Sequence, residues 1–446
     1  MNENTIRAVG GEDYRPTARR KAEKVNSLSF DIIGGKEVMP TGVWWGPYTN
    51  GNKSFPDYNT EEYYGYMKDL GVNFTSAVPN TIQSWKEVVM KSLKLSEKFG
   101  FGYFVNDAYF RGENITVETM KKQVSEYIGS PACFGVHVLD EPYPEEVPKL
   151  RNAFDTFGEL GFDDKYLYVN LLPMYGRFGD DDTRLKNYEN YVEEYCTLLK
   201  PKFLSYDFYA FKRAEYEWGR LKMFFDNLSV IRRVAKNHGI PFWAFVQTGG
   251  QFQCERTASE EEPEYPTEEG FLWNVNACLL YGAKCIQYFT FIQPDSFIHT
   301  AKGVTYDNLG IIGADGHKTK WYEPVKRANS IIRSYQKYLM NAENLGVIAV
   351  GKANELVFGD EKIESGTFRE LKKVKSENAI IGCFDYGGKT LLFVMNGDYE
   401  KETEIELSFD MPRGFDIISD GETSFLAGDK ITAKLEKGAS FIAILR

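Results

Sequence analysis

The stretch Cys133-Phe-Gly-Val-His-Val-Leu-Asp140-Glu141-Pro142 is an apolar run that ends in two adjacent carboxylates and a proline. Such a run is typical of a buried strand whose carboxyl end carries polar side chains. Loss of water and a like-charged neighbour both raise the pKa of a carboxyl group, which is how a general acid is made at neutral pH. In the alternative interpretation, Asp140 only caps the segment that follows and Glu141 is simply solvated.

Similar apolar runs recur on both sides of this stretch, and a helical pattern follows each of them. We expect eight strands, at residues 38–45, 72–78, 101–107, 133–140, 166–170, 203–207, 240–247 and 285–291. Eight strands that alternate with helices, with no glycine-rich phosphate loop after the first, predict an α/β protein with a (β/α)₈ TIM barrel. A doubly wound sheet is the weaker alternative.

The pattern changes after the barrel to short alternating strands, such as 379–384, 390–395 and 440–445, separated by Gly, Asp and Asn. This pattern of short strands and turn residues predicts a small antiparallel β-sandwich. We therefore expect an N-terminal leader at 1–37, a catalytic barrel at 38–340 and a β-sandwich domain at 341–446. The basic part of the leader, 15–24, is expected to be poorly ordered or to lie on the surface.

Composition excludes several function classes. The chain has 446 residues and a net charge of −11, which argues against nucleic acid or an anionic membrane as a partner. No apolar run is long enough to span a membrane and the N-terminus has no signal-peptide core, so we expect a cytoplasmic protein. The six cysteines and four histidines are scattered, so no disulfide framework, metal site or other cofactor is expected.

In a barrel of this kind the active site lies at the carboxyl ends of the strands. The residues expected there are Trp44, Trp45, Asp107, Asp140, Glu141, Asn170, Asp207, Tyr209, Gln247 and Gln293. Carboxylates do acid and base work on acetals, amides orient hydroxyl groups, and aromatic faces stack on sugar rings. The set predicts a neutral, hydroxylated substrate, namely an oligosaccharide or glycoside, although any single member could be a plain strand-end cap.

The strand-end motifs carry a family resemblance over most of 38–340. They are Gly42-Val-Trp-Trp, Val138-Leu-Asp-Glu-Pro, Leu204-Ser-Tyr-Asp-Phe-Tyr, Pro241-Phe-Trp-Ala-Phe-Val-Gln and Tyr281-Gly-Ala-Lys-Cys-Ile-Gln-Tyr-Phe-Thr. Their order resembles bacterial glycoside hydrolases related to the β-galactosidases and other clan A barrel enzymes. The resemblance implies a glycosidase that cleaves a terminal β-linked sugar, with Glu141 as the general acid/base.

One position departs from that clan. Its nucleophile is a glutamate that ends the seventh strand, and Gln247 stands in the matching place. A neutral amide cannot form the glycosyl-enzyme ester of a retaining enzyme. The Asp140-Glu141 pair resembles that of hexosaminidases in which the substrate's own acetamido group is the nucleophile, which implies that Asp140 would orient this group.

Other interpretations stay open. Asp207 could be the second carboxylate of a retaining or inverting enzyme on a 2-hydroxy sugar, or it could only anchor neighbouring tyrosines. Glu255 is a weaker candidate from a charged loop. A carbohydrate-binding barrel without catalysis also fits Gln247. The loops 175–183, 212–219 and 251–267 are expected to select the sugar.

Overall fold

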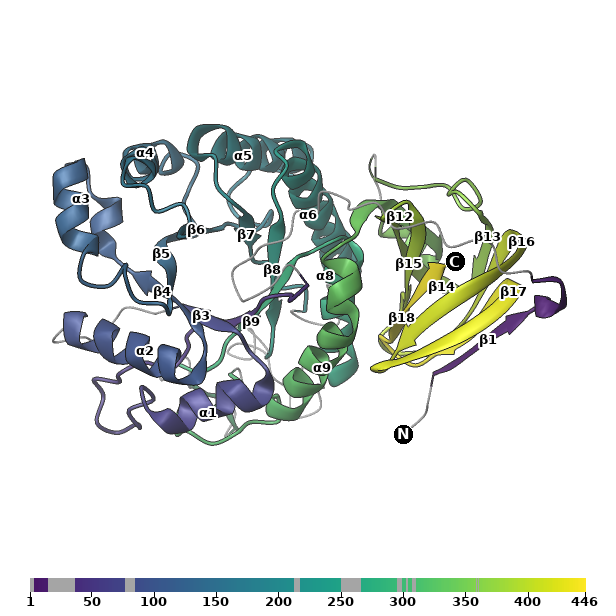
Figure 1. The fold of residues 1–446 in the computed structure, drawn as a ribbon, viewed down its shortest axis with the longest axis horizontal. Coiled ribbons are helices and arrows are strands. Elements are labelled where there is room, and N and C mark those ends of the chain that lie inside the picture. The colour runs from purple at the N-terminus through teal and green to yellow at the C-terminus, as the bar shows by residue number, and fades with distance from the viewer. Residues whose placement is uncertain are drawn as a thin grey trace.

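The computed structural model describes residues 4–14, 37–76, 85–211, 217–249, 266–294, 299–301, 304–306, 310–357, 359 and 361–446. A closed barrel with helices around it is followed by an antiparallel β-domain (Figure 1). The described residues do not include the basic part of the leader (15–24), Glu255, or the loop segments 212–216 and 250–265.

All eight strands expected for the barrel are present, and each pairs in parallel with its neighbours. They are β2 (Thr41–Val43), β3 (Phe74–Ser76), β4 (Gly102–Asn106), β5 (Cys133–Asp140), β6 (Tyr166–Leu171), β7 (Leu204–Tyr206), β8 (Phe242–Gln247) and β9 (Cys285–Phe289). The barrel closes where β2 pairs with β9. The prediction of a TIM barrel is thus confirmed, and the carboxyl ends of all eight strands face the same mouth.

Helices of the barrel alternate with its strands in the described chain. They are α1 (Glu61–Leu70), α2 (Trp85–Phe99), α3 (Val117–Val124), α4 (Arg151–Glu159), α5 (Arg184–Leu199), α6 (Glu217–Asn237), α8 (Glu268–Leu280) and α9 (Tyr322–Leu339). Short 3₁₀ turns precede α3 and α4, at η2 (Ala108–Arg111) and η3 (Val147–Leu150), and a hairpin of β10 (His299–Ala301) and β11 (Val304–Tyr306) follows β9. Glu141 and Pro142 therefore lead into a turn and not directly into a helix.

Large aromatic side chains fill the inside of the barrel. The rings of Phe203 and Trp243 stack with their centroids 3.8 Å apart, and Phe104 and Tyr168 pack edge to face at 5.1 Å. Gly42 makes room for this layer, because a Cβ there would lie 2.2 Å from the ring of Phe74. Much of the high aromatic content of the sequence is therefore core packing.

The β-domain is one antiparallel sheet in the order β1-β17-β16-β18-β15-β14-β12, with β13 paired to β16. Its strands are β12 (Glu343–Gly351), β13 (Leu371–Ser376), β14 (Asn378–Tyr386), β15 (Lys389–Asn396), β16 (Thr403–Ser419), β17 (Glu422–Leu435) and β18 (Ser440–Leu445), with a 3₁₀ turn, η6 (Lys352–Glu355), after β12. A finding that the sequence did not predict is that β1 (Thr5–Val9), followed by η1 (Gly11–Asp13), completes this sheet by pairing with β17. The first and the last strand of the described chain thus lie in the same sheet, with β17 and β16 between them (Figure 1).

Helices α8 and α9 lie between the barrel and the β-domain (Figure 1). Helix α8 is buried on every side from Gly270 to Leu280, apart from the half-buried Leu272, which explains why it is apolar all round. Hydrogen bonds join the two parts, from the amide of Asn276 to the carbonyl of Gly438 (2.9 Å) and from the hydroxyl of Tyr335 to the carbonyl of Ser440 (3.1 Å).

Candidate active site

Three carboxyl groups and one amide meet at the mouth of the barrel. Asp140 is the last residue of β5 and Glu141 follows it, while Asp207 directly follows β7. Asn170 lies on β6, the strand between them, and its register partners are Asp140 on one side and Ser205 on the other. Neighbouring parallel strands that end at the same level therefore bring these side chains together.

The amide of Asn170 bridges two of the carboxylates. Its nitrogen donates to Oδ1 of Asp140 over 3.3 Å and to Oδ1 of Asp207 over 3.1 Å. An amide nitrogen has two N–H groups, so one goes to each carboxylate. The carboxylates of Asp140 and Asp207 thus bind the same amide group, which fixes their positions relative to each other.

A chain of polar groups inside the barrel fixes the orientation of this amide. The hydroxyl of Ser205 donates to Oδ1 of Asn170 (3.0 Å), and Nε2 of Gln287 donates to that hydroxyl (3.1 Å). Oε1 of Gln287 in turn accepts from the hydroxyl of Tyr168 (2.7 Å). The hydroxyl of Ser205 also lies 3.2 Å from that of Tyr168, so its one proton has two acceptors within reach. The nitrogen of Asn170 faces the carboxylates because carboxylate oxygens accept hydrogen bonds.

Asp140 titrates far from its ordinary range. Burial, and next the charge of Glu141, raise its pKa from 3.8 to about 7, while the Asn170 hydrogen bond and the Arg111 charge oppose the rise. Asp140 is exposed to solvent by its accessible surface, yet most of its surroundings are protein. These surroundings set its pKa, because burial removes bulk water and the nearby charges act directly on the carboxyl group. Asp140 therefore exchanges its proton near neutral pH.

Glu141 and Asp207 interact directly. Burial raises the pKa of Glu141, and a hydrogen bond from the Asp207 carboxyl opposes this. Burial raises the pKa of Asp207 well above its usual range, and the charges of Glu141 and Asp140 add to the rise. A hydrogen-bonded pair of buried carboxyl groups keeps one proton between them, since two negative charges in contact repel each other. In that hydrogen bond Asp207 is the donor and Glu141 the acceptor, so the shared proton lies on Asp207 and would pass to Glu141 for Glu141 to act as a general acid.

The backbone is unusual at two positions of the mouth. Glu141 has φ 48° and Trp45 has φ 46°, a left-handed conformation that residues with a side chain seldom adopt. The amide N–H of Glu141 donates to the carbonyl of Asn170 (2.8 Å), and the carbonyl of Trp45 accepts from Ile292 (3.0 Å). Such conformations are retained where the surrounding structure holds them, often at functional sites.

Arg111 is a charged neighbour of the site that the sequence analysis missed. It lies in η2, and its guanidinium donates to the carbonyl of Val138 (2.5 Å) and to Oδ1 of Asn106 (3.1 Å). Its positive charge acts on Asp140. A cation four residues after the strand-end Asp107 is the signal in the sequence that could have identified it.

The two tryptophans predicted to bind substrate have different surroundings. Trp44 is 7% exposed and packs edge to face on His137 (4.9 Å) and Phe245 (5.6 Å), inside the aromatic layer of the barrel. Trp45 is half-buried, with its ring 5.6 Å from that of Phe289. Trp45 is therefore the one of the two with surface available at the mouth.

Asp107 and Gln247 have their polar atoms engaged within the protein. The carboxylate of Asp107 accepts from Gln123 (3.1 and 3.0 Å), the hydroxyl of Tyr127 (2.7 Å) and the amide of Tyr109 (3.0 Å). The carboxylate of Asp107 therefore ties β4 to α3 and the segment after it, and its hydrogen-bond partners are not other predicted site residues.

Gln247 is fully buried, and its amide makes three hydrogen bonds to backbone. Its oxygen accepts from the N–H of Phe211 (3.0 Å), and its nitrogen donates to the carbonyls of Phe211 and Gly249 (both 3.0 Å). Only an amide can both accept and donate in this way. The glutamine thus holds the segment after β7 against β8.

Tyr209 and Gln293 complete the predicted set. Tyr209 is buried after β7 and forms a hydrogen bond to Asp207, with its ring 5.3 Å from Phe289. Gln293 is buried, and its backbone N–H donates to the carbonyl of Ile312 (2.9 Å). Tyr209 therefore belongs to the carboxyl cluster, while Gln293 lies in the segment that leaves β9.

A second pair that the sequence did not reveal is Tyr175 and Arg220. The Arg220 guanidinium lies 3.7 Å from the centre of the Tyr175 ring and donates to the carbonyl of Tyr209 (2.9 and 3.1 Å). Burial raises the pKa of Tyr175, and the charges of Asp207 and Glu141 contribute. Tyr175 therefore adds a phenol to the site beside the carboxyl pair.

Across the described residues, no group of three or more His, Cys, Asp or Glu side chains is arranged to hold a metal ion. In the same part of the chain, no helix is long and apolar enough to cross a membrane.

The fold has counterparts among solved structures. AmyP, in structures with maltotriose and with maltose, superposes with TM-scores of 0.53 and 0.52 at 11% identity, over 92% of this chain and 97% and 96% of AmyP. The chain shares its fold with AmyP. The family 51 α-L-arabinofuranosidase AbfB from Bifidobacterium longum aligns with a TM-score of 0.45 at 11% identity, over 94% of this chain and 98% of AbfB. No protein-family model and no curated protein sequence matches the chain.

Proposed function

We propose that the protein is a glycosidase that removes a terminal β-linked sugar, with Glu141 as the proton donor. The observation that carries this proposal is the carboxyl cluster at the barrel mouth, in which burial raises the pKa of Glu141 and of Asp207. Cleavage of a glycosidic bond needs a carboxylic acid that is still protonated at the working pH. The fold shared with AmyP, which is in complex with maltose, agrees with a sugar ligand.

We further propose that the 2-acetamido group of the substrate is the nucleophile, and that Asp140 orients it. Gln247 has its amide committed to backbone, and Asp207 is committed to Glu141, Asn170 and Tyr209. Of the three clustered carboxyl residues, Asp140 is the most exposed, since Glu141 is half-buried and Asp207 is buried. A group next to the proton donor that is held by Asn170 and exposed to substrate suits the electrostatic partner of a substrate-assisted reaction.

A second candidate is a retaining or inverting glycosidase on a 2-hydroxy sugar, with Asp207 as the second carboxylate. Its support is the direct contact of Asp207 with Glu141. Retaining pairs stand about 5 to 5.5 Å apart and inverting pairs about 6.5 to 9.5 Å. Asp207 would therefore have to move away from Glu141 when substrate enters, which makes this the less supported mechanism.

The experiment compares matched 4-nitrophenyl β-glycosides that carry either a 2-acetamido or a 2-hydroxy group on the same sugar. Release of nitrophenol from the acetamido sugars alone is expected. Good turnover of the 2-hydroxy sugars would rule out substrate assistance and favour the mechanism in which Asp207 is the second carboxylate. Binding of sugars with no release from any glycoside would make the protein a carbohydrate-binding barrel without catalysis.

A further inference from the structure

An exposed aromatic side chain lies two residues beyond the proposed proton donor. Tyr143 is 41% exposed, whereas Tyr168, Tyr188, Tyr195 and Tyr206 are each at most 1% exposed. Two residues of chain separate Cα atoms by no more than about 7 Å, so Tyr143 starts within one sugar ring of Glu141. An exposed aromatic ring this close to the proposed proton donor offers a face on which a sugar ring can stack.

The backbone around Tyr143 is held in place. The carbonyl of Pro142 accepts from the hydroxyl of Tyr191 on α5 (2.8 Å), and the N–H of Tyr143 donates to the carboxylate of Glu146 (2.8 Å). The next turn, η3, then continues into α4. Tyr143 is thus presented on a fixed segment and pays little conformational entropy on binding a ligand.

A cation from the facing loop flanks the ring. The guanidinium carbon of Arg177 lies 5.9 Å from the centre of the Tyr143 ring. Arg177 is exposed, and it forms no ion pair with any other residue that the structure describes. Its N–H groups are therefore available to the hydroxyl groups of a ligand that lies on the ring.

The loop that carries Arg177 is fixed from both sides. Phe178, the next residue, is buried against the rings of Tyr188 (5.2 Å) and Tyr191 (5.1 Å), so the same Tyr191 supports both halves of the surface.

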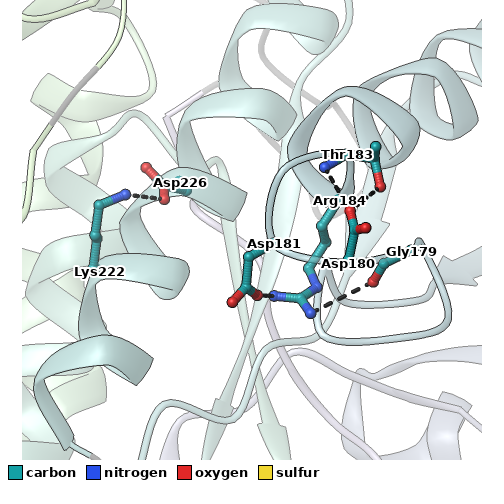
Figure 2. A network of polar contacts seen from close by, with 7 residues as sticks. All are labelled: Gly179, Asp180, Asp181, Thr183, Arg184, Lys222 and Asp226. Atoms are coloured by element: carbon teal, nitrogen blue, oxygen red, sulfur yellow. Dashed lines mark hydrogen bonds and ion pairs between the residues drawn. The ribbon is translucent and has the colours of Figure 1, made fainter.

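Polar contacts fix the rest of this loop. Arg184 donates to Asp181 (2.5 Å) and to the carbonyl of Gly179 (3.5 Å), and Thr183 donates to Asp180 (2.7 Å), as Figure 2 shows. These contacts connect the loop to the start of α5, while the pair Lys222 and Asp226 in the same view belongs to α6. Tyr143 and Arg177 are therefore presented by two anchored segments.

We propose that Tyr143 and Arg177 form the subsite for the leaving group, and that this leaving group is itself a sugar. The inference rests on the proposed function, because a proton donor protonates the oxygen of the leaving group and so places that group on its own side of the site. A sugar ring stacks its C–H face on the tyrosine and turns its hydroxyl groups to the arginine. The protein would then act on a disaccharide or longer chain.

The test compares two substrates of the same sugar, the disaccharide and the glycosyl fluoride, whose leaving group is too small to reach Tyr143. In Tyr143→Ala, the ratio of kcat/KM for the disaccharide to that for the fluoride should fall about three- to ten-fold, as expected for the loss of one stacking contact. Tyr143→Phe should keep the ratio, and Arg177→Ala should lower it. Phe425→Ala, which removes an exposed ring of the β-domain (47% exposed), is the matched control and should not change it.

Binding provides a readout that does not depend on turnover. Calorimetry of the Glu141→Gln protein, which is expected not to cleave the disaccharide, with N,N′-diacetylchitobiose and N-acetylglucosamine should give a preference for the disaccharide that an added Tyr143→Ala reduces three- to ten-fold. A second outcome is that the unaltered protein turns over no substrate, while the disaccharide is still preferred in binding and Tyr143→Ala reduces that preference. This result would contradict the proposed catalysis but support the subsite. A ratio unchanged by Tyr143→Ala, or no preference for the disaccharide, would overturn the subsite even if the enzyme is active.

Discussion

The carboxyl group of Asp207 is hydrogen-bonded to that of Glu141, although the two residues follow β7 and β5, which are not neighbours in the barrel. Asn170 on the intervening strand and Tyr209 also bond to Asp207 and hold it in this position. The pair therefore keeps a proton at a pH at which isolated carboxyl groups have lost theirs. Asp207 is the donor in this hydrogen bond, so the proton would first pass to Glu141, which would then deliver it to a leaving group.

Asp207→Asn separates the two mechanisms. If Asp207 only shares a proton with Glu141, the variant should keep turnover at pH 5 within about ten-fold, and the alkaline limb of its pH–rate profile should move to lower pH, because the partner that retains the proton is gone. Asp140→Asn should instead lose about 10²-fold or more at every pH. Complete loss in Asp207→Asn at all pH values would identify Asp207 as a nucleophile or base.

The pKa of Asp140 predicts a pH-dependent stability. Its pKa is about 7 in the folded protein against an ordinary 3.8, so the folded state binds more protons between these values. The free energy of unfolding therefore falls as pH rises through this window. Asp140→Asn removes this loss. Its Tm should match wild type near pH 4 and exceed it at pH 8, and a difference in Tm that does not change with pH would contradict the pKa.

Gln247→Glu should not create a nucleophile. The new carboxylate would be fully buried and would face the carbonyl oxygens of Phe211 and Gly249, to which the amide now donates. The free energy of unfolding should drop by roughly 3 kcal/mol or more near neutral pH. Gln247→Met, of similar size and without charge, should lose less, and urea unfolding of both variants measures the difference. A stable Gln247→Glu protein with raised turnover would contradict this structural role.

The barrel could be predicted because each strand is a short apolar run that ends in polar residues. This pattern is local, so it can be recognised in the sequence without knowledge of tertiary contacts. The pairing of β1 with β17 could not be predicted, because paired residues are at least 421 positions apart, as in Val9 and Lys430, and neither segment has a sequence feature that indicates its partner. The Asp140-Glu141 pair was predicted for the same local reason as the barrel. The roles of the other strand ends depend on tertiary contacts.

Two residues illustrate this limit. Asp107 and Gln247 end strands as Asp140 does, yet their polar atoms bond to α3 and to the backbone after β7. Arg111 lies in a turn and Tyr175 in a loop, so no strand-end pattern marks them. A strand-end polar group is available to a substrate only if other residues do not already occupy its hydrogen-bonding atoms. Those residues come from other parts of the chain, so the local sequence does not reveal them.

The most direct test of Glu141 as the proton donor is the dependence of its loss on the leaving group. Glu141→Gln keeps the size of the side chain but has no proton to give. The variant should lose about 10² to 10⁴-fold in kcat/KM with a poorly acidic leaving group such as methanol or a sugar, and far less with 2,4-dinitrophenol, which leaves without protonation. Equal losses for both leaving groups, or only a two- to three-fold loss with the poor one, would contradict the assignment of Glu141.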